Sequence, residues 1–471
     1  MKNPSVSVLA TVFALVTISA EAAELSLSGF GTLGVAKSNQ RYNFERFINN
    51  GGTIARDSVA GVQADVKFTE SVGATVQGKF APSLKNDSSW DTTLSWAFLS
   101  WRPANDLLIR LGKQRAPLYL NSESMDVGVT YDFARLPAEM YSISPSSDYV
   151  GASLSKTWNP SLGELTLDGY AGNIGTNWRV YQRDNVQLPG SPMQPGANFK
   201  SISVDSSGFA LTLLREEDKY HASVQKQTTA IRPYSPAYLS LIPAAGFAPV
   251  ITPGIAQALE AMGMPSAGPA GVGAAATAAA AAGTLGGSVY TVLPQAQAAS
   301  AHSLVYSLGA EINLPKGFRV IGEYGRRKVT NVATGIDTNG GYFALLKDVG
   351  AWTPYVSYAT IKSSSDLLNQ YQSVNSNPGL TVAPSPLAVI ANGAAAAINA
   401  SQRVLADGML AYDQHTLALG TSYRLSPTQK IKFEWARTQV GVASSFVDAP
   451  SFGNVSKQNI DVLSFSYNVV F

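Results

Sequence analysis

The sequence contains no cysteine, which excludes disulfide bonds and thiolate chemistry. Charged residues are also scarce, at 14% of the chain, whereas soluble domains usually carry about 25%. Beyond the N-terminal segment there is no apolar run as long as the roughly 20 residues of a membrane-spanning helix. The formal net charge of +2 is too small to favour nucleic-acid binding. Hydrophobic residues still make up 45% of the chain, so they must be dispersed, as in strands that alternate between two faces.

The N-terminal segment has the pattern of an export signal. Lys2 precedes an apolar stretch over 6–18, and Ala20-Glu21-Ala22 forms a small-x-small cleavage site. We therefore predict a signal peptide over 1–22 and a mature chain over 23–471. The alternative, an N-terminal membrane anchor, is disfavoured by the small residues before the expected cut.

The last residues of the sequence alternate strictly between apolar and polar. Phe465, Tyr467, Val469 and Phe471 fall on one face of a strand, and Ser466 and Asn468 fall on the other. An exposed row of aromatic residues has little use in a soluble protein. A strand that closes a barrel in lipid requires such a row.

Most of the sixteen predicted strands repeat this alternation. In the segment 430–435, Ile431, Phe433 and Trp435 oppose Lys430, Lys432 and Glu434. A soluble barrel would pack its apolar residues inside. Because the polar faces carry full charges of both signs, we expect these faces to line water and the apolar faces to meet lipid. Aromatic residues near strand ends predict girdles at the two membrane interfaces, among them Trp101, Trp158, Tyr170, Tyr324 and Trp352.

Short and long connections alternate along the chain. Seven short turns are expected, at 69–71, 102–106, 159–163, 216–218, 315–317, 348–350 and 426–428. Eight longer connections are expected between them, at 37–57, 81–92, 115–147, 173–205, 227–300, 328–340, 363–413 and 439–456. This parity predicts an all-β fold, a 16-stranded antiparallel transmembrane β-barrel with short periplasmic turns and long extracellular loops.

Two of the long loops, 227–300 and 363–413, have unusual compositions. Alanine, glycine and proline dominate 243–300, where a short helix after Pro253 fits the spacing, and 383–408 is also rich in alanine. Such segments serve either as surface decoration that need not pack or as a lid or partial plug over the pore mouth.

Several segments resemble Gram-negative outer-membrane porins of the 16-stranded general type. They are Leu25-Ser26-Leu27-Ser28-Gly29-Phe30-Gly31, the run from Arg110 to Pro117, the hairpin from Leu417 to Pro427 and the terminal aromatic strand. The resemblance implies a barrel that is often trimeric, with an inward-folded third loop, here 115–147. In that loop, Pro137-Ala138-Glu139 stands in place of the Pro-Glu-Phe-Gly-Gly motif of enterobacterial porins.

The resemblance also implies where the protein works and with what. We expect it in the cell outer membrane of a Gram-negative bacterium, in contact with outer-membrane lipid and lipopolysaccharide. The barrel-assembly machinery would recognise the C-terminal strand, in which Phe465, Tyr467 and Phe471 face the membrane. We also expect a homotrimer that interacts with small hydrophilic solutes and holds no cofactor and no metal.

Charged residues are the candidates for selecting solutes, because a pore selects by its diameter and by rings of charge. Acids of the third loop would face bases of the wall and set up a field across the narrowest point. The candidate residues at this constriction are Lys67, Lys79, Arg110, Arg115, Glu123, Asp126, Asp132, Arg319, Arg327, Arg424 and Lys432, with Arg135 and Glu139 also in the loop. The alternative is that each is a solvated lumen residue far from the constriction.

The predicted function is passive diffusion of small hydrophilic solutes and ions through a water-filled pore. One alternative is a substrate-selective channel gated by its long loops, and another is a closed barrel that serves as an adhesin or enzyme. Enzymatic readings have little support, since nothing places His221, His302 or His415 beside a serine and an orienting acid. No metal-binding His-x-x-x-His spacing or phosphate-binding glycine loop occurs.

Overall fold

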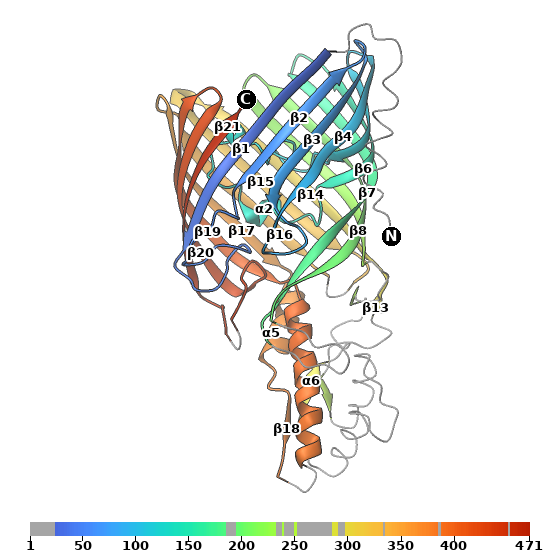
Figure 1. Ribbon diagram of the computed structural model, residues 1–471, viewed down its shortest axis with the longest axis vertical. Coiled ribbons are helices and arrows are strands. Elements are labelled where there is room, and N and C mark those ends of the chain that lie inside the picture. The colour runs from blue at the N-terminus through green and yellow to red at the C-terminus, as the bar shows by residue number, and fades with distance from the viewer. Residues whose placement is uncertain are drawn as a thin grey trace.

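The computed structural model describes residues 24–184, 195–231, 238–239, 249–251, 285–290, 297–332, 335–384, 388–450 and 453–471. The signal peptide predicted over 1–22 and the helix predicted after Pro253 lie outside these residues. Sixteen strands form one closed antiparallel barrel, in which β1 pairs with both β2 and β21 (Figure 1). The predicted fold class is confirmed.

The barrel strands follow one another around the wall in sequence order. They are β1 (Glu24–Ser38), β2 (Val59–Lys67), β3 (Val72–Pro82), β4 (Trp90–Ala104), β5 (Leu107–Arg115), β6 (Asp148–Trp158), β7 (Glu164–Gln182), β8 (Gly196–Arg215), β9 (Asp218–Ile231), β14 (Ala301–Leu314), β15 (Phe318–Val329), β16 (Thr338–Lys347), β17 (Trp352–Ser363), β19 (Tyr412–Ser426), β20 (Gln429–Ser444) and β21 (Asn459–Val470).

The seven short and eight long connections occur where the sequence predicts them, although several are shorter than predicted because strands extend into them, and the largest difference is in the fourth long connection. The segment 173–205, predicted as a loop, is largely strand, because β7 and β8 stay paired from Asn173–Asp205 out to Gln182–Gly196. This hairpin extends past the apolar part of the wall. Alternation is not required there, so the pattern that identifies the other strands is absent.

The side chains of the wall divide as predicted. On β20, Phe433 is 44% exposed on the outside, whereas Lys432 is completely buried on the inside. On β21, Leu463 is 63% exposed and Ser466 only 2%. Apolar side chains therefore cover the outer surface and polar side chains fill the interior.

The aromatic residues near strand ends fall into two groups. Trp101, Trp158 and Trp352 are exposed on the outside near the short turns, and Tyr324 is exposed on the outside of β15. The assignment of Tyr170 to a girdle is wrong. Its side chain points inward, is 6% exposed and stacks on Tyr149, because position 170 belongs to the polar face of its strand.

The seventh long loop forms a projection beyond the barrel. It contains α5 (Ser365–Ser376), which Ser364 caps, β18 (Leu380–Val382) and α6 (Ala388–Gly408). β18 pairs with β12 (Leu285–Tyr290) of the fifth loop, which also pairs with β11 (Pro249–Ile251). The last loop strands, β10 (Tyr238–Leu239) and β13 (Gln297–Ala298), pair with each other.

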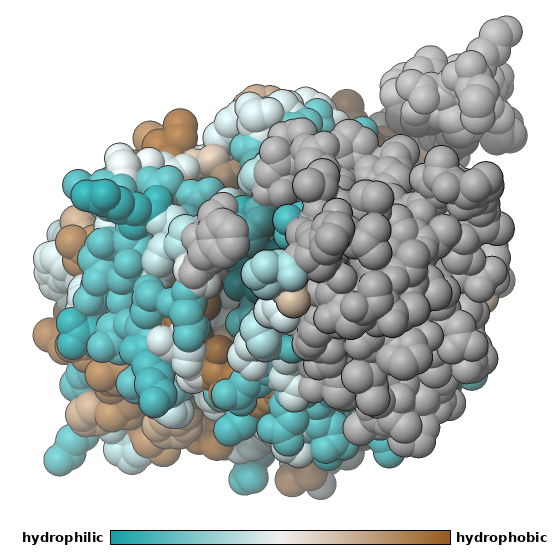
Figure 2. Space-filling view, turned by 90° about the horizontal axis from the view of Figure 1, so that it is seen from below, coloured by the Kyte–Doolittle hydropathy of each residue, from teal (hydrophilic) through white to brown (hydrophobic). Residues whose placement is uncertain are grey.

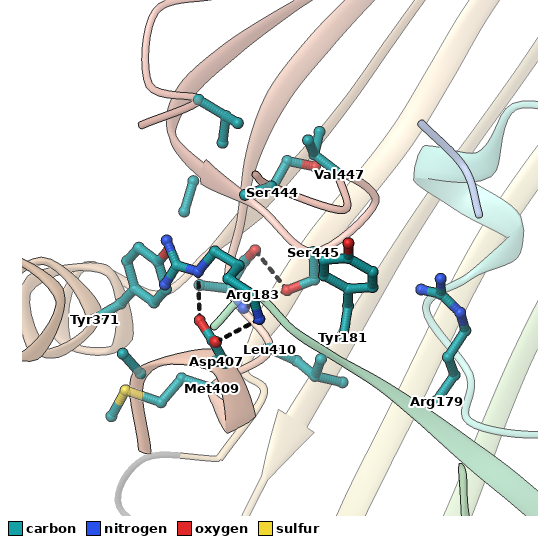
Figure 3. Close-up of a pocket in the computed structure, with 15 residues that line it drawn as sticks. Arg179, Tyr181, Arg183, Tyr371, Asp407, Met409, Leu410, Ser444, Ser445 and Val447 are labelled. Atoms are coloured by element: carbon teal, nitrogen blue, oxygen red, sulfur yellow. Dashed lines mark hydrogen bonds and ion pairs between the residues drawn. The ribbon is translucent and has the colours of Figure 1, made fainter. Parts of the chain in front are cut away.

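This projection extends from the end of the barrel that carries the long loops, so its two helices, α5 and α6, lie outside the lumen (Figure 1). The end of α6 is fixed to the rim by Asp407, whose side chain is 1% exposed and accepts the backbone N–H of Arg183 at 2.9 Å (Figure 3). In the described part of the chain, no helix is both long and apolar enough to cross a membrane.

Candidate pore constriction

The third long loop, 116–147, lies inside the barrel. It contains a 3₁₀ turn, η1 (Gly128–Thr130), and a short helix, α2 (Ala138–Tyr141). Phe133 is 1% exposed and meets Tyr342 and Tyr355 of the wall edge-on, with ring centroids 5.7 and 5.2 Å away. The other buried apolar residues of the loop pack against the same face of β14–β17: Leu118, Leu120, Leu136, Met140 and Ile143. This apolar cluster explains why the loop follows the wall.

Hydrogen bonds fix the beginning of the loop to β9, β14 and β15. The carbonyl of Leu118 accepts the hydroxyl of Ser223 at 3.0 Å, and also that of Ser307. The backbone N–H of Leu120 and the hydroxyl of Tyr141 donate to the carboxylate of Glu323 at 2.9 and 2.7 Å. The wall thus satisfies backbone groups that the loop would otherwise bury without partners.

Asp132 is the most heavily paired acid of the loop. It accepts Lys430 and Ser422, each at 2.7 Å, and pairs with Arg319. Burial alone would raise the pKa of its carboxyl, but Lys430 and Arg319 lower it well below the usual range. The next wall lysine, Lys432, donates to the carbonyl of Phe133 at 2.8 Å. These contacts attach the middle of the loop to β15, β19 and β20.

The tip of the loop reaches the opposite part of the wall through Asp126. Its carboxylate lies 2.8 Å from Lys79 on β3 and 2.8 Å from Arg115 on β5, while Arg115 also pairs with Asp148 at 3.0 Å. Burial alone would raise the pKa of Asp126, but Arg115 and Lys79 lower it to about 2. Asp126 is therefore ionised at neutral pH.

Arg135 and Glu139 occupy the last part of the loop. Arg135 forms a bidentate pair with Asp57 of the first long loop, at 2.7 and 2.8 Å. Glu139 is 3% exposed and accepts Gln414 at 2.8 Å and Thr416 at 2.5 Å. Its pKa is raised, chiefly by burial.

On the side of the loop that faces β1–β3, an opening remains. A cavity of about 570 Å³ lies there, bordered by the wall, the third loop and the first and eighth long loops. Its charged lining residues are Glu45, Arg46, Arg56, Asp57, Lys79, Asp126, Arg135 and Arg179. Viewed from the loop end, hydrophilic residues border a hollow between the loops (Figure 2).

The candidate site residues fall into three groups. Lys79, Arg115, Asp126, Asp132 and Arg319 meet in ion pairs between loop and wall, and Arg110 lies 3.6 Å from Glu123. These acids and bases are therefore in direct contact, whereas the sequence predicts that they face each other across the open pore. Lys432 supports the loop from a fully buried position. Lys67, paired with Glu70, and the exposed Arg424 lie at the short-turn end, and Arg327 borders a second cavity of about 400 Å³.

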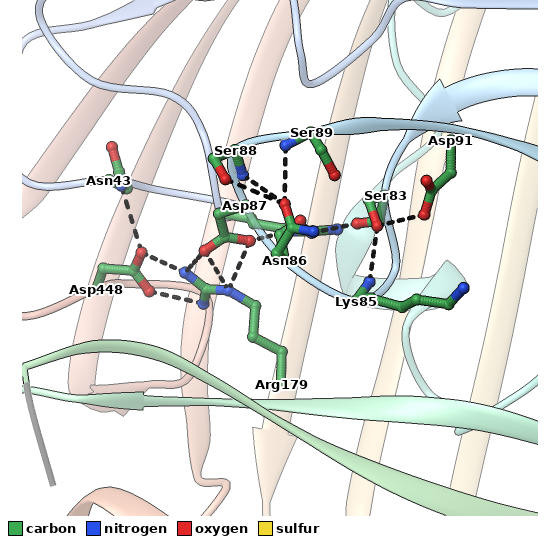
Figure 4. Close-up of polar contacts among 11 residues, drawn as sticks. Asn43, Ser83, Lys85, Asn86, Asp87, Ser88, Ser89, Asp91, Arg179 and Asp448 are labelled. Atoms are coloured by element: carbon green, nitrogen blue, oxygen red, sulfur yellow. Dashed lines mark hydrogen bonds and ion pairs between the residues drawn. The ribbon is translucent and has the colours of Figure 1, made fainter. Parts of the chain in front are cut away.

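A second cluster, at the mouth of the barrel, is absent from the sequence prediction. Arg179 on β7 bridges Asp87 of the second long loop at 2.8 Å and Asp448 of the eighth at 2.6 Å (Figure 4). Arg46 of the first loop also pairs with Asp87, at 2.5 Å. Arg179 lies in the segment predicted as loop, and its partners are 92 and 269 residues away. No local signal relates them.

The aromatic residues predicted to face the membrane lie on β21 and at the end of the chain. Phe465 is 38% exposed and Phe471 is 74% exposed, whereas Tyr467 is partly buried. Phe471 and Gly29 exchange backbone hydrogen bonds of 2.8 and 3.0 Å, which complete the seam between the last residue and β1.

An apolar outer surface, a polar interior and a closed antiparallel wall together define a transmembrane β-barrel of the outer-membrane type. The protein is therefore an outer-membrane barrel of 16 strands, with one loop folded into its lumen. Among the described residues, no group of three or more histidine or acidic side chains is arranged to hold a metal ion.

Comparison with solved structures finds outer-membrane porins and channels at low sequence identity. The anion-selective porin from Comamonas acidovorans is 11% identical, with a TM-score of 0.49 over 95% of this chain and all of that one. Salmonella typhi OmpF, in a complex with daunomycin, is 9% identical (TM-score 0.45, 96% and 99% covered). The outer membrane channel DcaP of Acinetobacter baumannii is also 9% identical (TM-score 0.46, 96% and 99% covered). No protein-family model matches the chain, and no curated protein is significantly similar to it.

The ion pairs of Asp126 predict that the attachment of the third loop to the wall weakens at acidic pH. Its folded pKa lies below the value of about 3.9 for an unfolded aspartate, so its ionised form stabilises the attached loop above that pH. This stabilisation is lost as the pH falls from about 4 toward 2. We expect steady single-channel currents at neutral pH and loop-dependent fluctuations only below about pH 4.

The variant Asp126→Asn should show those fluctuations already at pH 7, because it cannot ionise. Asp106→Asn is the matched control, since Asp106 is an exposed acid at the short-turn end, paired with Lys156. Identical current traces for Asp126→Asn and the wild type at pH 7 would contradict the assigned role.

Proposed function

We propose that the protein is a porin through which small hydrophilic solutes and ions diffuse passively. The observation that carries the proposal is the position of the third loop. It occupies one side of the lumen and leaves a charged, water-accessible opening of about 570 Å³ on the other side. A loop bound to the wall by apolar contacts and ion pairs restricts the size of solutes without closing the channel.

The charges at the opening support weak ion selectivity in preference to a dedicated solute site. The lining carries both bases and acids, and most lie in pairs, such as Lys79 with Asp126 and Arg135 with Asp57. Paired charges leave little net electric field, so discrimination between cations and anions would be weak. Catalysis is not part of the proposal. His221 lies on the inner wall with its Nδ1 3.0 Å from the hydroxyl of Thr212, a pair to which the proposal gives no catalytic role.

Planar-bilayer recording tests the proposal directly. Purified protein should insert in discrete steps of current, each with an ohmic conductance at low voltage, and the reversal potential in a salt gradient should indicate a weak ion preference. Vesicles that contain the protein should release small sugars and retain large dextrans. A folded barrel that inserts but stays electrically silent would overturn the porin assignment and favour a closed barrel.

The remaining expectations belong to the same proposal. They are a signal peptide removed on export, assembly through the C-terminal strand by the barrel-assembly machinery, a homotrimer, and contact with outer-membrane lipid and lipopolysaccharide. Cross-linking followed by mass measurement of the native complex tests the trimer. A monomer at all concentrations would contradict that part alone.

A further inference from the structure

One sector of the outer surface, formed by β8, β9, β14 and β15, carries exposed bases above a groove. We define the basic cluster as Lys226, Arg326 and Lys328, all exposed on the outside. Lys226 and Lys328 flank Leu304 in one cross-strand row, since both pair with it in register. Arg326 lies one row closer to the short turns, opposite Tyr306. Neighbouring strands are about 4.8 Å apart and same-face rows about 7 Å apart, so the three bases are attached to the wall within about 12 Å of one another.

The basic cluster lies toward the end of the barrel that carries the long loops. Lys328 is next to Val329, the last residue of β15, and Lys226 is five residues before the end of β9. Within the described residues, none of the three bases forms an ion pair. Other outward-facing bases near this end do have acidic partners, such as Arg437 with Asp461 at 2.8 Å. The nearest acid along β8, Asp205, accepts a hydrogen bond from Asn173.

Below the basic cluster, the wall is hollowed. A groove of about 680 Å³ opens to the outside, and its exposed lining is almost entirely apolar. Small residues form its floor: Ala222, Gly309, Ala310 and Gly322. Larger side chains border it, among them Leu211, Leu308 and Tyr324. Short side chains in adjacent strands create this depression in an otherwise even apolar surface.

The groove and the basic cluster occupy successive rows of the same strands. The row Ala222–Leu308–Tyr324 borders the groove, the next row is Val224–Tyr306–Arg326, and the third is Lys226–Leu304–Lys328. Rows on one face are about 7 Å apart, because a strand rises about 3.4 Å per residue. From the groove to the basic cluster, the surface is therefore first apolar, then carries a tyrosine, and is finally cationic. A lipid presents its acyl chains, its interfacial region and its phosphates in the same order.

We propose that this sector binds lipopolysaccharide, with headgroup phosphates on the basic cluster and acyl chains in the groove. Three unpaired bases favour a headgroup with several phosphates over one with a single phosphate. A second copy of this chain is a poorer occupant, because beside the basic cluster β8 offers one exposed acid, Asp205, against three bases. The inference rests on the outer-membrane location of the barrel and not on its conduction.

Binding of purified lipopolysaccharide to the folded protein in nanodiscs tests this site. The variant Lys226→Gln/Arg326→Gln/Lys328→Gln should weaken the apparent affinity by about 10- to 100-fold. The matched control, Lys37→Gln/Lys85→Gln/Lys457→Gln, removes three exposed bases outside this sector and should change it less than about 2-fold. Dephosphorylated lipopolysaccharide should bind the wild type as weakly as intact lipopolysaccharide binds the triple variant.

A second variant tests the groove independently of charge. Ala222→Phe places a large apolar side chain on the groove floor, where lipid contact tolerates it, and should reduce affinity while leaving the bases intact. Equal loss of affinity in the control triple, or equal binding of phosphatidylglycerol, would overturn the proposal. So would a change of oligomeric state without a change in lipid binding, which would make this sector a subunit contact. Conductance recorded in parallel reports separately on the porin assignment.

Discussion

The variant Asp132→Asn is expected to release the third loop from the wall. Asp132 balances Lys430 and Arg319 in a largely buried position, with side-chain exposures of 9%, 13% and 19%. Removing one partner of a buried pair leaves uncompensated charge, at a cost of roughly 2–4 kcal/mol after allowance for the partial exposure of the bases. At about 3 kcal/mol, the population of detached loop rises about 100-fold.

Single-channel recording measures this release as more frequent transitions between current levels. The loss of a negative charge should also shift the reversal potential toward anions. Asp461→Asn is the matched control, because it removes an acid that is paired with Arg437 on the outside of the barrel. Lys430→Gln in the Asp132→Asn background should restore much of the steadiness by removing a charge left without its partner. Steady currents in Asp132→Asn would contradict the anchoring role.

The variant Arg179→Gln is expected to separate the loops at the mouth. Arg179 donates to both oxygens of Asp448 and pairs with Asp87, so its loss leaves Asp448 without its basic partner while Asp87 keeps Arg46. Burial raises the pKa of Asp448, and Arg179 opposes this effect. Without Arg179, Asp448 is buried without a base, at a cost of roughly 2–4 kcal/mol, and the ion-pair bridge between the second and eighth loops is lost.

The absence of native cysteine makes this separation measurable. Spin labels on Ser88→Cys and Asn454→Cys, both exposed, report the distance between the second and eighth loops. In wild type we expect a narrow distance distribution, and in Arg179→Gln a broader and longer one. Arg179→Lys keeps the charge but not the bidentate geometry, and should lie between them. An unchanged distribution in Arg179→Gln would show that other contacts hold these loops.

The ion pairs of the third loop and the Arg179 cluster at the mouth differ in how far their residues could be predicted from the sequence. Asp126 and Asp132 are acids in the third long loop, which the porin resemblance implies is folded into the lumen, and Lys79 and Arg319 lie on the polar faces of predicted strands. The types of partner could therefore be inferred. Which acid meets which base could not, because the contact depends on the path of the loop along β14–β17, set by Phe133 and its apolar neighbours.

Arg179 was missed for a related reason. Beyond the apolar belt, β7 and β8 no longer alternate, so the sequence pattern ends where the hairpin continues. The residue then lies at the mouth only because closure of the barrel brings the second, fourth and eighth loops together. The basic cluster could not be predicted either, because Lys226 and Lys328 share a row only through their common register with Leu304.

The residue pattern alone determined the wall of this protein: sixteen strands, their direction, and which face of each meets lipid. Alternation has a period of two, so a local run of residues suffices to orient a strand. Only the tertiary structure decided the contacts inside the wall, at its mouth and on its outer surface. These contacts join residues tens to hundreds of positions apart, and packing and register, which no local pattern encodes, bring them together.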